Sequence, residues 1–179
     1  MTTPGPGDQP LRELREIPDP GFAGDTGAVD AGLAEALAAY AAEPRGGRAR
    51  VLDALGRSRL LVPVVAVLGE VEHDEAGLAH DKTSDMAAVL LRGGDGRLAL
   101  LAFSGTAPLT AWNAEARPVP VSAQVAAQSA LQEGAAALVL DVAGPTTVVV
   151  EGEDLQAVAL GWRLTRIGDG LGWIRPPEE

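Results

Sequence analysis

The stretch His80–Phe103, HDKTSDMAAVLLRGGDGRLALLAF, decides the fold. Two apolar runs, Met86–Leu91 and Leu98–Phe103, flank a Gly- and Asp-rich turn at Arg92–Arg97. Apolar runs joined by such a turn are typical of a β-hairpin. Neither run alternates apolar with polar residues, so we expect both faces of the hairpin to be covered. The hairpin is therefore predicted to lie in the middle of a sheet.

The flanking sequence predicts elements on both sides of this hairpin. Helices are expected over residues 31–42, 48–55, 123–133 and 153–161, with Asp30 as the cap of the first and Gly46–Gly47 closing it. Strands are expected over residues 60–68, 138–142 and 147–150, and a small closing hairpin over residues 162–175. Pro63 favours an edge position for the first of these strands, or a place at the start of a strand. Arg117–Val121, with two prolines, is expected to be an extended connector, and Thr110 to cap a short helical turn.

This order of elements predicts an α+β fold. We expect a mixed, largely antiparallel sheet of about five strands, built from two hairpins plus one strand, with helices packed on it. The length of 179 residues suits one domain. Residues 1–28 are rich in Pro and Gly and are predicted to be a flexible N-terminal tail, residues 29–175 a single domain, and residues 176–179 a C-terminal tail.

Composition narrows the classes of function. The net charge of −11 argues against nucleic-acid binding and against an anionic membrane surface, because both need a basic footprint. The absence of cysteine excludes disulfides, thiolate metal sites and Cys nucleophiles. The first ten residues do not resemble a secretory signal, and no apolar stretch is long enough to span a membrane. We therefore expect a cytoplasmic protein without a cofactor.

The polar run that enters the hairpin is the best candidate site. Lys82, the one Lys beside thirteen Arg, lies there with Ser84 and Asp85. Ser104 and Thr106 follow the second strand of the hairpin. Because the start of one antiparallel strand lies beside the end of the other, Asp85 and Ser104 are expected to be neighbours. These side chains could bind a small amino acid or an anionic group, or they could simply be a solvated strand entrance in which Ser84 or Asp85 caps backbone amides.

Two other readings of the polar residues remain open. Lys82 and Ser84 could form a Ser/Lys-dependent hydrolase, which would also need a base with a lowered pKa and an oxyanion hole. The acidic segment with His73 and His80 lacks the ligand spacing of a calcium loop, so no metal site is predicted. Trp112 is kept as a candidate ligand contact, although a role in packing is the commoner use of such a residue.

Four short motifs together resemble the SseB N-terminal domain family, the enhanced serine sensitivity proteins, in its actinobacterial form. The motifs are Leu61–Val64, Asp81–Ala87, Leu101–Gly105 followed by Trp112, and Val139–Pro145. The resemblance covers about residues 30–162. It implies a compact α and β domain, in a family that is named for a growth phenotype and has no established reaction or cofactor.

We expect from all this a non-catalytic cytoplasmic domain that contacts a protein partner or a small metabolite such as an amino acid. The alternatives are the Ser/Lys hydrolase and a self-associating structural domain with exposed strand edges, which would form a homodimer or a larger assembly.

Overall fold

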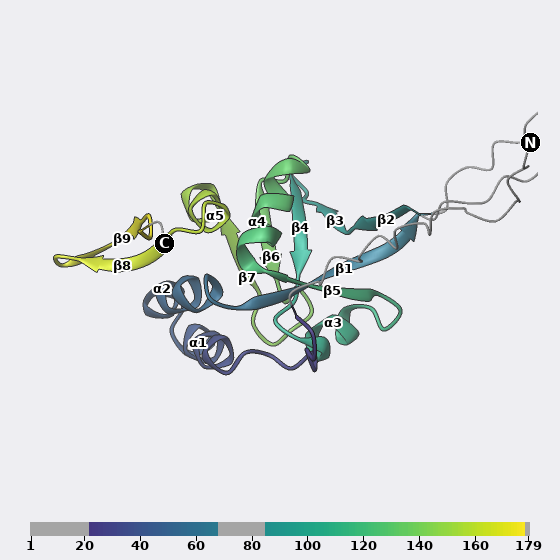
Figure 1. The fold of residues 1–179 in the computed structure, drawn as a ribbon, viewed down its shortest axis with the longest axis horizontal. Helices are drawn as coiled ribbons and strands as arrows, with labels where there is room; N and C mark the ends of the chain where they lie inside the picture. The colour runs from purple at the N-terminus through teal and green to yellow at the C-terminus, as the bar shows by residue number, and fades with distance from the viewer. Residues whose placement is uncertain (1–21, 68–84, 178–179) are drawn as a thin grey trace, which may run out of the picture.

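The computed structural model describes residues 22–67 and 85–177, and it has the predicted α+β fold (Figure 1). The helices within these ranges are α1 (Ala31–Ala42), α2 (Pro44–Leu55), α3 (Thr106–Trp112), α4 (Ala123–Gln132) and α5 (Gly152–Ala159). The strands there are β1 (Arg59–Val67), β2 (Asp85–Ala88), β3 (Leu90–Arg92), β4 (Leu98–Ala102), β5 (Arg117–Ser122), β6 (Ala137–Leu140), β7 (Val148–Glu151), β8 (Arg163–Ile167) and β9 (Gly170–Ile174). Within the described ranges, no helix is both long and apolar enough to cross a bilayer.

The strands of the body form two sheets that are joined by backbone hydrogen bonds. One sheet has the order β2-β1-β5 and the other β3-β4-β6-β7. Leu61 of β1 and Phe103, just after β4, exchange two backbone hydrogen bonds of 2.8 and 2.9 Å. This bridge joins the sheets into one strongly bent, mixed arrangement in which β5, β1, β4, β6 and β7 follow one another. Among the strands of the described residues, only β4 and β6 pair in parallel.

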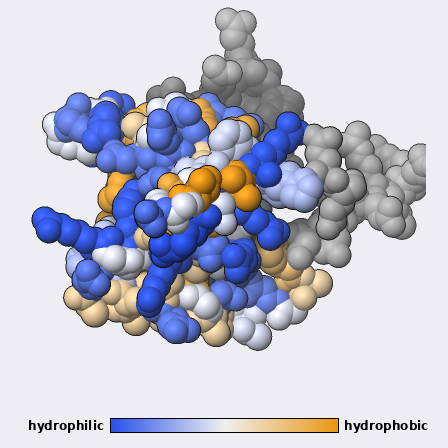
Figure 2. Space-filling model, turned by 90° about the vertical axis from the view of Figure 1, so that its left-hand side faces the viewer, coloured by the Kyte–Doolittle hydropathy of each residue, from blue (hydrophilic) through white to orange (hydrophobic). Residues whose placement is uncertain are grey.

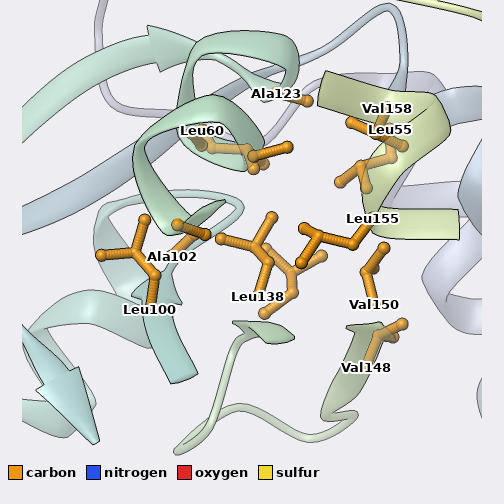
Figure 3. Packing of buried hydrophobic residues seen from close by; sticks show 14 of the residues in the cluster. Leu55, Leu60, Leu100, Ala102, Ala123, Leu138, Val148, Val150, Leu155 and Val158 are labelled. Atoms are coloured by element: carbon orange, nitrogen blue, oxygen red, sulfur yellow. The ribbon is translucent and has the colours of Figure 1, made fainter. Parts of the chain in front are cut away.

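The main core lies between the second sheet and its helices. Figure 3 shows side chains of β4, β6 and β7 meeting those of α4 and α5, with Leu138 near the centre. Leu100 and Leu101 are both fully buried although they point to opposite faces of β4, so this strand is covered on both faces as predicted. Leu101 belongs to a second, smaller core cluster with Phe103 and Leu109.

The hairpin prediction was right for one half and wrong for the other. β3 and β4 pair across the Gly- and Asp-rich turn, with Leu90 opposite Leu100. The first apolar run, however, is split at Val89: β2 pairs with β1, and β3 is the edge of its sheet rather than its middle. Val89 connects the two sheets, because its N–H donates to Pro63 O and its carbonyl accepts from Leu101 N. Each of these hydrogen bonds is 3.2 Å long.

Prolines caused two further errors. Pro63 lies in β1, the central strand of its sheet, where it faces Pro118 of β5. The two prolines lose no hydrogen bond to each other, because β1 and β5 exchange none at this pair. On the other side of β1, the missing Pro63 N–H leaves Val89 O without a partner in β1, and Val89 O accepts from Leu101 N instead. The expected connector Arg117–Val121 is accordingly an edge strand, β5.

The helix boundaries also correct the sequence analysis. Asp30 caps α1 as predicted, since its carboxylate accepts from Leu33 N at 3.0 Å. α2 begins at Pro44 rather than at residue 48, because Pro fits the first turn of a helix. Gly47 does not end a helix: a Cβ there would lie 2.4 Å from the Tyr40 Cα, so this glycine allows α1 and α2 to pack closely. Thr110 lies inside α3, which Gly105 precedes.

Two terminal segments complete the described chain. Residues 25–28 of the expected N-terminal tail contact the body, for Gly27 O accepts from Thr106 N at 2.8 Å. β8 and β9 form the predicted closing hairpin, which extends from the body at the left of Figure 1.

Candidate functional site

The predicted site residues do not all come together. Lys82 and Ser84 lie outside the described residues. Asp85 begins β2 and pairs with Val67, whereas Ser104 follows Phe103, which pairs with Leu61. Six residues of β1 separate these two points, about 20 Å of extended strand. The expected contact between Asp85 and Ser104 is therefore wrong, because the chain leaves β4 for β1 at Val89.

Trp112 has a place in the core. Its ring lies 5.5 Å from that of Phe103 between centroids, and it packs against the smaller core cluster. Offset aromatic pairs of this kind add to stability beyond the area that they bury. Trp112 thus packs within the protein rather than with Ser104 and Thr106 at the end of β4.

Ser104 is paired instead with Asp141, a residue that the sequence analysis did not select as a site. The Ser104 N–H donates to Asp141 Oδ1 at 2.8 Å, and its hydroxyl donates to Oδ2 at 2.7 Å. Both residues are buried, with 4% and 3% of their surface exposed. They meet because β4 and β6 are adjacent parallel strands and each residue follows the carboxyl end of its strand. Ligand sites of α/β sheets commonly lie at such ends.

The backbone at Asp141 is held in an unusual conformation. Its φ is +54°, in the left-handed region that residues other than Gly, Asn and Asp seldom adopt. Its N–H donates to Ala102 O at 3.0 Å, and its carbonyl accepts from Gly144 N and from the Thr147 hydroxyl. Burial raises the pKa of the Asp141 carboxyl, and the two hydrogen bonds from Ser104 oppose that shift with a smaller effect.

A pocket of about 610 Å³ opens above this pair. Its walls come from α1, from the loop before α1, from the start of α3 and from the β6–β7 loop. Leu37, Ser104 and Asp141 lie at its buried floor, whereas Ala38 and Ala41 are at its exposed rim. The remaining lining residues are Gly27, Ala28, Val29, Ala34, Gly105, Thr106, Ala107, Pro108, Pro145 and Thr146. The walls are mostly apolar, and Asp141 is the only titratable side chain among these described residues.

Arg59 holds one wall of the pocket in place through hydrogen bonds. Its guanidinium donates to Ser104 O at 2.9 Å and to Ala28 O at 2.8 Å. It also forms an ion pair with Asp25 through both carboxylate oxygens. The hydrogen bond from Arg59, followed by that from the Gly27 N–H, lowers the pKa of the Asp25 carboxyl. One arginine thus holds residues 25–28 against the end of β4.

Of the predicted site residues, Ser104 and Thr106 line the pocket, whereas Asp141 and the apolar face of α1 were missed. A signal for Asp141 was present in the sequence: it is an acidic residue that directly follows a buried apolar run and precedes Gly144–Pro145. A polar residue at the end of an otherwise apolar strand can indicate a site. The face of α1 gave no such signal, because its residues are those of any packed helix.

Comparison with known proteins places this chain in one family. The SseB protein N-terminal domain matches residues 33–157, well over half of the chain and including both Ser104 and Asp141. No curated protein matches, and neither does any solved structure. The resemblance seen in the four sequence motifs is therefore confirmed at the level of the family, and the chain belongs to the SseB N-terminal domain family.

Proposed function

We propose that this protein is a non-catalytic binding domain whose pocket receives a small metabolite or an apolar side chain of a protein partner. The observation that carries the proposal is the pocket above Ser104 and Asp141. Its volume of about 610 Å³ falls within the usual range for ligand sites. Mostly apolar walls with a polar pair at the floor are the usual composition of such sites as well.

The shape of the pocket favours a ligand with an apolar portion. A free amino acid with an aliphatic side chain, such as leucine, would place that side chain against Leu37 and Ala34. Its charged groups would stay at the rim, where the solvent still reaches them. Desolvating both charges inside an apolar pocket would cost too much free energy.

Binding is a better description of this pocket than catalysis. The Ser104 hydroxyl is buried and donates a hydrogen bond to Asp141 Oδ2, so it is engaged in a structural contact. No His, Lys or Arg is among the described residues that line the pocket, and a Ser nucleophile needs such a neighbour or a comparable base. The Ser/Lys hydrolase would depend on Lys82 and Ser84. In that case the wild type should cleave an ester such as p-nitrophenyl acetate, and Ser84→Ala should lose this activity.

Thermal unfolding with added ligand tests the proposal. Leucine, valine, phenylalanine and a set of nucleotides are added in turn to the full chain. A ligand present at 100 times its Kd stabilises the folded state by about 2.7 kcal/mol, roughly 5–10 °C in Tm for a chain of this size. Ala38→Phe, which places a ring in the rim of the pocket, should remove the shift.

Ala42→Phe is the matched control, because Ala42 is exposed on the same helix and is not among the pocket residues. The protein-partner form of the proposal is tested with the same pair of variants in a pull-down. The proposal fails if no compound shifts Tm and no captured protein is lost selectively in Ala38→Phe.

The fine assignment within the family is also a proposal. Thirteen Arg and a single Lys indicate a genome whose codon bias replaces Lys with Arg, which supports the actinobacterial type. We further propose that the protein works in the cytoplasm, in keeping with its acidic, cysteine-free composition.

A further inference from the structure

The β8–β9 hairpin lies outside the residues that the family shares with this chain, since the match ends at residue 157. Within residues 22–67 and 85–177, β8 and β9 pair only with each other in a two-stranded sheet. Figure 1 shows this hairpin extending away from the rest of the chain. A two-stranded hairpin is at best marginally stable on its own in water. The stability of the β8–β9 hairpin therefore depends on the contacts of its side chains and of its strand edges.

Only the base of the hairpin is held by the body. Leu164 and Trp173, which face each other across the two strands, pack against the main core. The Trp173 indole N–H also donates to Asp154 Oδ1 at 3.1 Å. β8 lies against α2. These contacts fix the direction of the hairpin and leave its tip exposed.

Apolar side chains are unusually exposed on this hairpin. Ile167, Leu171 and Ile174 have 57%, 53% and 44% of their surface exposed. Figure 2 views the molecule from this end and shows an orange group near the centre of the face, with blue residues around it. Large aliphatic residues gathered on an exposed element are typical of a contact surface.

The charge of the hairpin is opposite to that of the rest of the chain. Residues 162–175 contain Arg163, Arg166 and Arg175 but only Asp169, which gives +2. The whole chain carries −11, so the remaining residues carry −13. Within the described part of the chain, neither Arg163 nor Arg166 takes part in an ion pair. The hairpin thus offers positive charge that the body does not neutralise there.

The edge of β9 lacks the usual protection against pairing. Exposed strand edges commonly carry charged residues, Pro or a bulge, and Gly170–Ile174 contains no charged residue and no Pro. The turn at Gly168–Asp169 has two residues, so hydrogen-bonded pairs alternate outward from Ile167–Gly170. By this alternation the Leu171 N–H points away from β8 and is free to pair with an added strand.

We propose that the hairpin binds an acidic, extended segment of a partner protein, which adds as a strand along β9. Adjacent strands lie about 4.8 Å apart, so an added strand would be about 10 Å from β8. The long side chains of Arg163 and Arg166 can cross β9 over that distance and meet carboxylates of the segment. Apolar residues of the segment would cover Leu171 on one face and Ile167 or Ile174 on the other.

The probe is a labelled seven-residue peptide in which pairs of glutamates alternate with pairs of valines, so that each face of an added strand carries both residue types. Fluorescence anisotropy with the full chain is the measurement. Arg163→Glu/Arg166→Glu should weaken binding by roughly tenfold or more, because two attractive charges become repulsive. Arg92→Glu/Arg117→Glu is the matched control: both arginines are exposed, they lie on β3 and β5, which Figure 1 shows away from the hairpin, and the change in net charge is identical. Raising the salt from about 50 to about 500 mM should weaken binding to the wild type.

A second pair of variants tests the added strand itself. Leu171→Pro removes the outward N–H, and Pro is tolerated where that N–H faces solvent. Leu171→Ala removes the same apolar side chain but keeps the N–H, so it should lose much less affinity than Leu171→Pro. Circular dichroism and Tm verify that each variant is folded.

Four outcomes in the measurements on the protein and the peptide would overturn the proposal, and a fifth comes from lipid vesicles. They are no binding of the peptide to the wild type, equal binding to both double charge reversals, and equal affinity of Leu171→Pro and Leu171→Ala. The fourth is a wild type with twice the mass of 18.3 kDa in solution that becomes monomeric in Leu171→Pro, which would assign the edge to a second copy. Binding to anionic phosphatidylserine vesicles with no affinity for the peptide would likewise reject a protein segment as the ligand.

Discussion

Ser104 and Asp141 lie 37 residues apart in the chain and are joined by two hydrogen bonds of 2.7 and 2.8 Å. Each residue follows one of the two parallel strands, so this double contact fixes the ends of β4 and β6 relative to each other. It also forms the floor of the pocket. The stability of the sheet and the shape of the proposed binding site therefore depend on the same pair.

Asp141→Ala should be more destabilising than Ser104→Ala. The alanine leaves the buried N–H and hydroxyl of Ser104 without acceptors and places a less tolerant residue at positive φ, at a cost of about 2–4 kcal/mol. Ser104→Ala removes one hydrogen bond and keeps the backbone one, at a cost of about 1–2 kcal/mol. Urea unfolding measures both changes in the free energy of unfolding.

Asp53→Ala is the control for this series. Asp53 forms an exposed ion pair with Arg57 one helical turn away, which is worth about 0.5 kcal/mol or less. If Asp141→Ala lowers the free energy of unfolding by no more than Asp53→Ala does, this result would contradict a structural role for the buried pair of Ser104 and Asp141.

Stability should depend on pH through Asp141. Burial raises the pKa of its carboxyl in the folded state, so the folded protein keeps a proton at pH values where the unfolded chain has lost it. The stability from this group is fully present below the ordinary carboxyl pKa and is lost as the pH rises through the raised one. The difference in unfolding free energy between the wild type and Asp141→Asn should therefore shrink as the pH rises above the ordinary carboxyl pKa of about 4. Urea unfolding at several pH values measures it.

Asp25 should behave in the opposite way and serves as the internal comparison. Arg59 lowers the pKa of the Asp25 carboxyl, so its contribution is present above the ordinary carboxyl pKa and is lost as the pH falls through the lowered one. The advantage of the wild type over Asp25→Asn should shrink toward acid. If the difference in unfolding free energy between the wild type and Asp141→Asn stays constant or grows as the pH rises, the pKa of the Asp141 carboxyl is not raised in the folded protein.

Local signals in the sequence predicted the parts of the fold that depend on local interactions. Asp30 precedes an apolar helical pattern and caps α1, and the turns at Ala143–Thr146 and Gly168–Asp169 join the strands that flank them. The switch of pairing at Val89 could not be read in the same way. Met86–Leu91 is one continuous apolar run, and nothing within it indicates that its first half pairs with a strand more than twenty residues earlier.

The site was predicted less well for the same physical reason. Ser104 and Thr106 were selected because polar residues follow a buried strand, and both line the pocket. Their true partner depends on the parallel pairing of β4 and β6, and α4 packs against both of these strands. A contact across 37 residues of chain is a consequence of tertiary structure, so the motif around Asp141 could not reveal it.

Arg59→Ala should detach residues 25–28 from the body. The substitution removes the ion pair with Asp25 and the hydrogen bonds to Ser104 O and Ala28 O, in a side chain that is only 12% exposed. Hydrogen bonds to charged groups contribute about 1.5–3 kcal/mol each when buried, and this partly buried set should amount to about 2–3 kcal/mol. Hydrogen exchange should become faster at the Gly27 and Thr106 amides.

Arg57→Ala provides the comparison, because Arg57 is a neighbouring arginine whose ion pair with Asp53 is solvent-exposed. It should leave the exchange rate of the Thr106 amide unchanged. Equal effects of the two substitutions at that amide would contradict the role given to Arg59.

Gly27→Ala should disturb the pocket more than Gly24→Ala, although both glycines have positive φ, +75° and +85°. The conformational strain is similar in the two variants, about 1–2 kcal/mol. A Cβ on Gly24 meets nothing within 4 Å, whereas a Cβ on Gly27 would lie 2.0 Å from the Thr106 Oγ1. The Thr106 hydroxyl, which lies in one wall of the pocket, must then turn away, or the start of α3 must shift. If the apolar pocket binds the ligand, Gly27→Ala should lower the affinity for that ligand, whereas Gly24→Ala should lower only the free energy of unfolding. Titration calorimetry measures the affinity, and urea unfolding measures the free energy of unfolding. Equal affinity in both variants would mean that the loop before α1 does not shape the binding site.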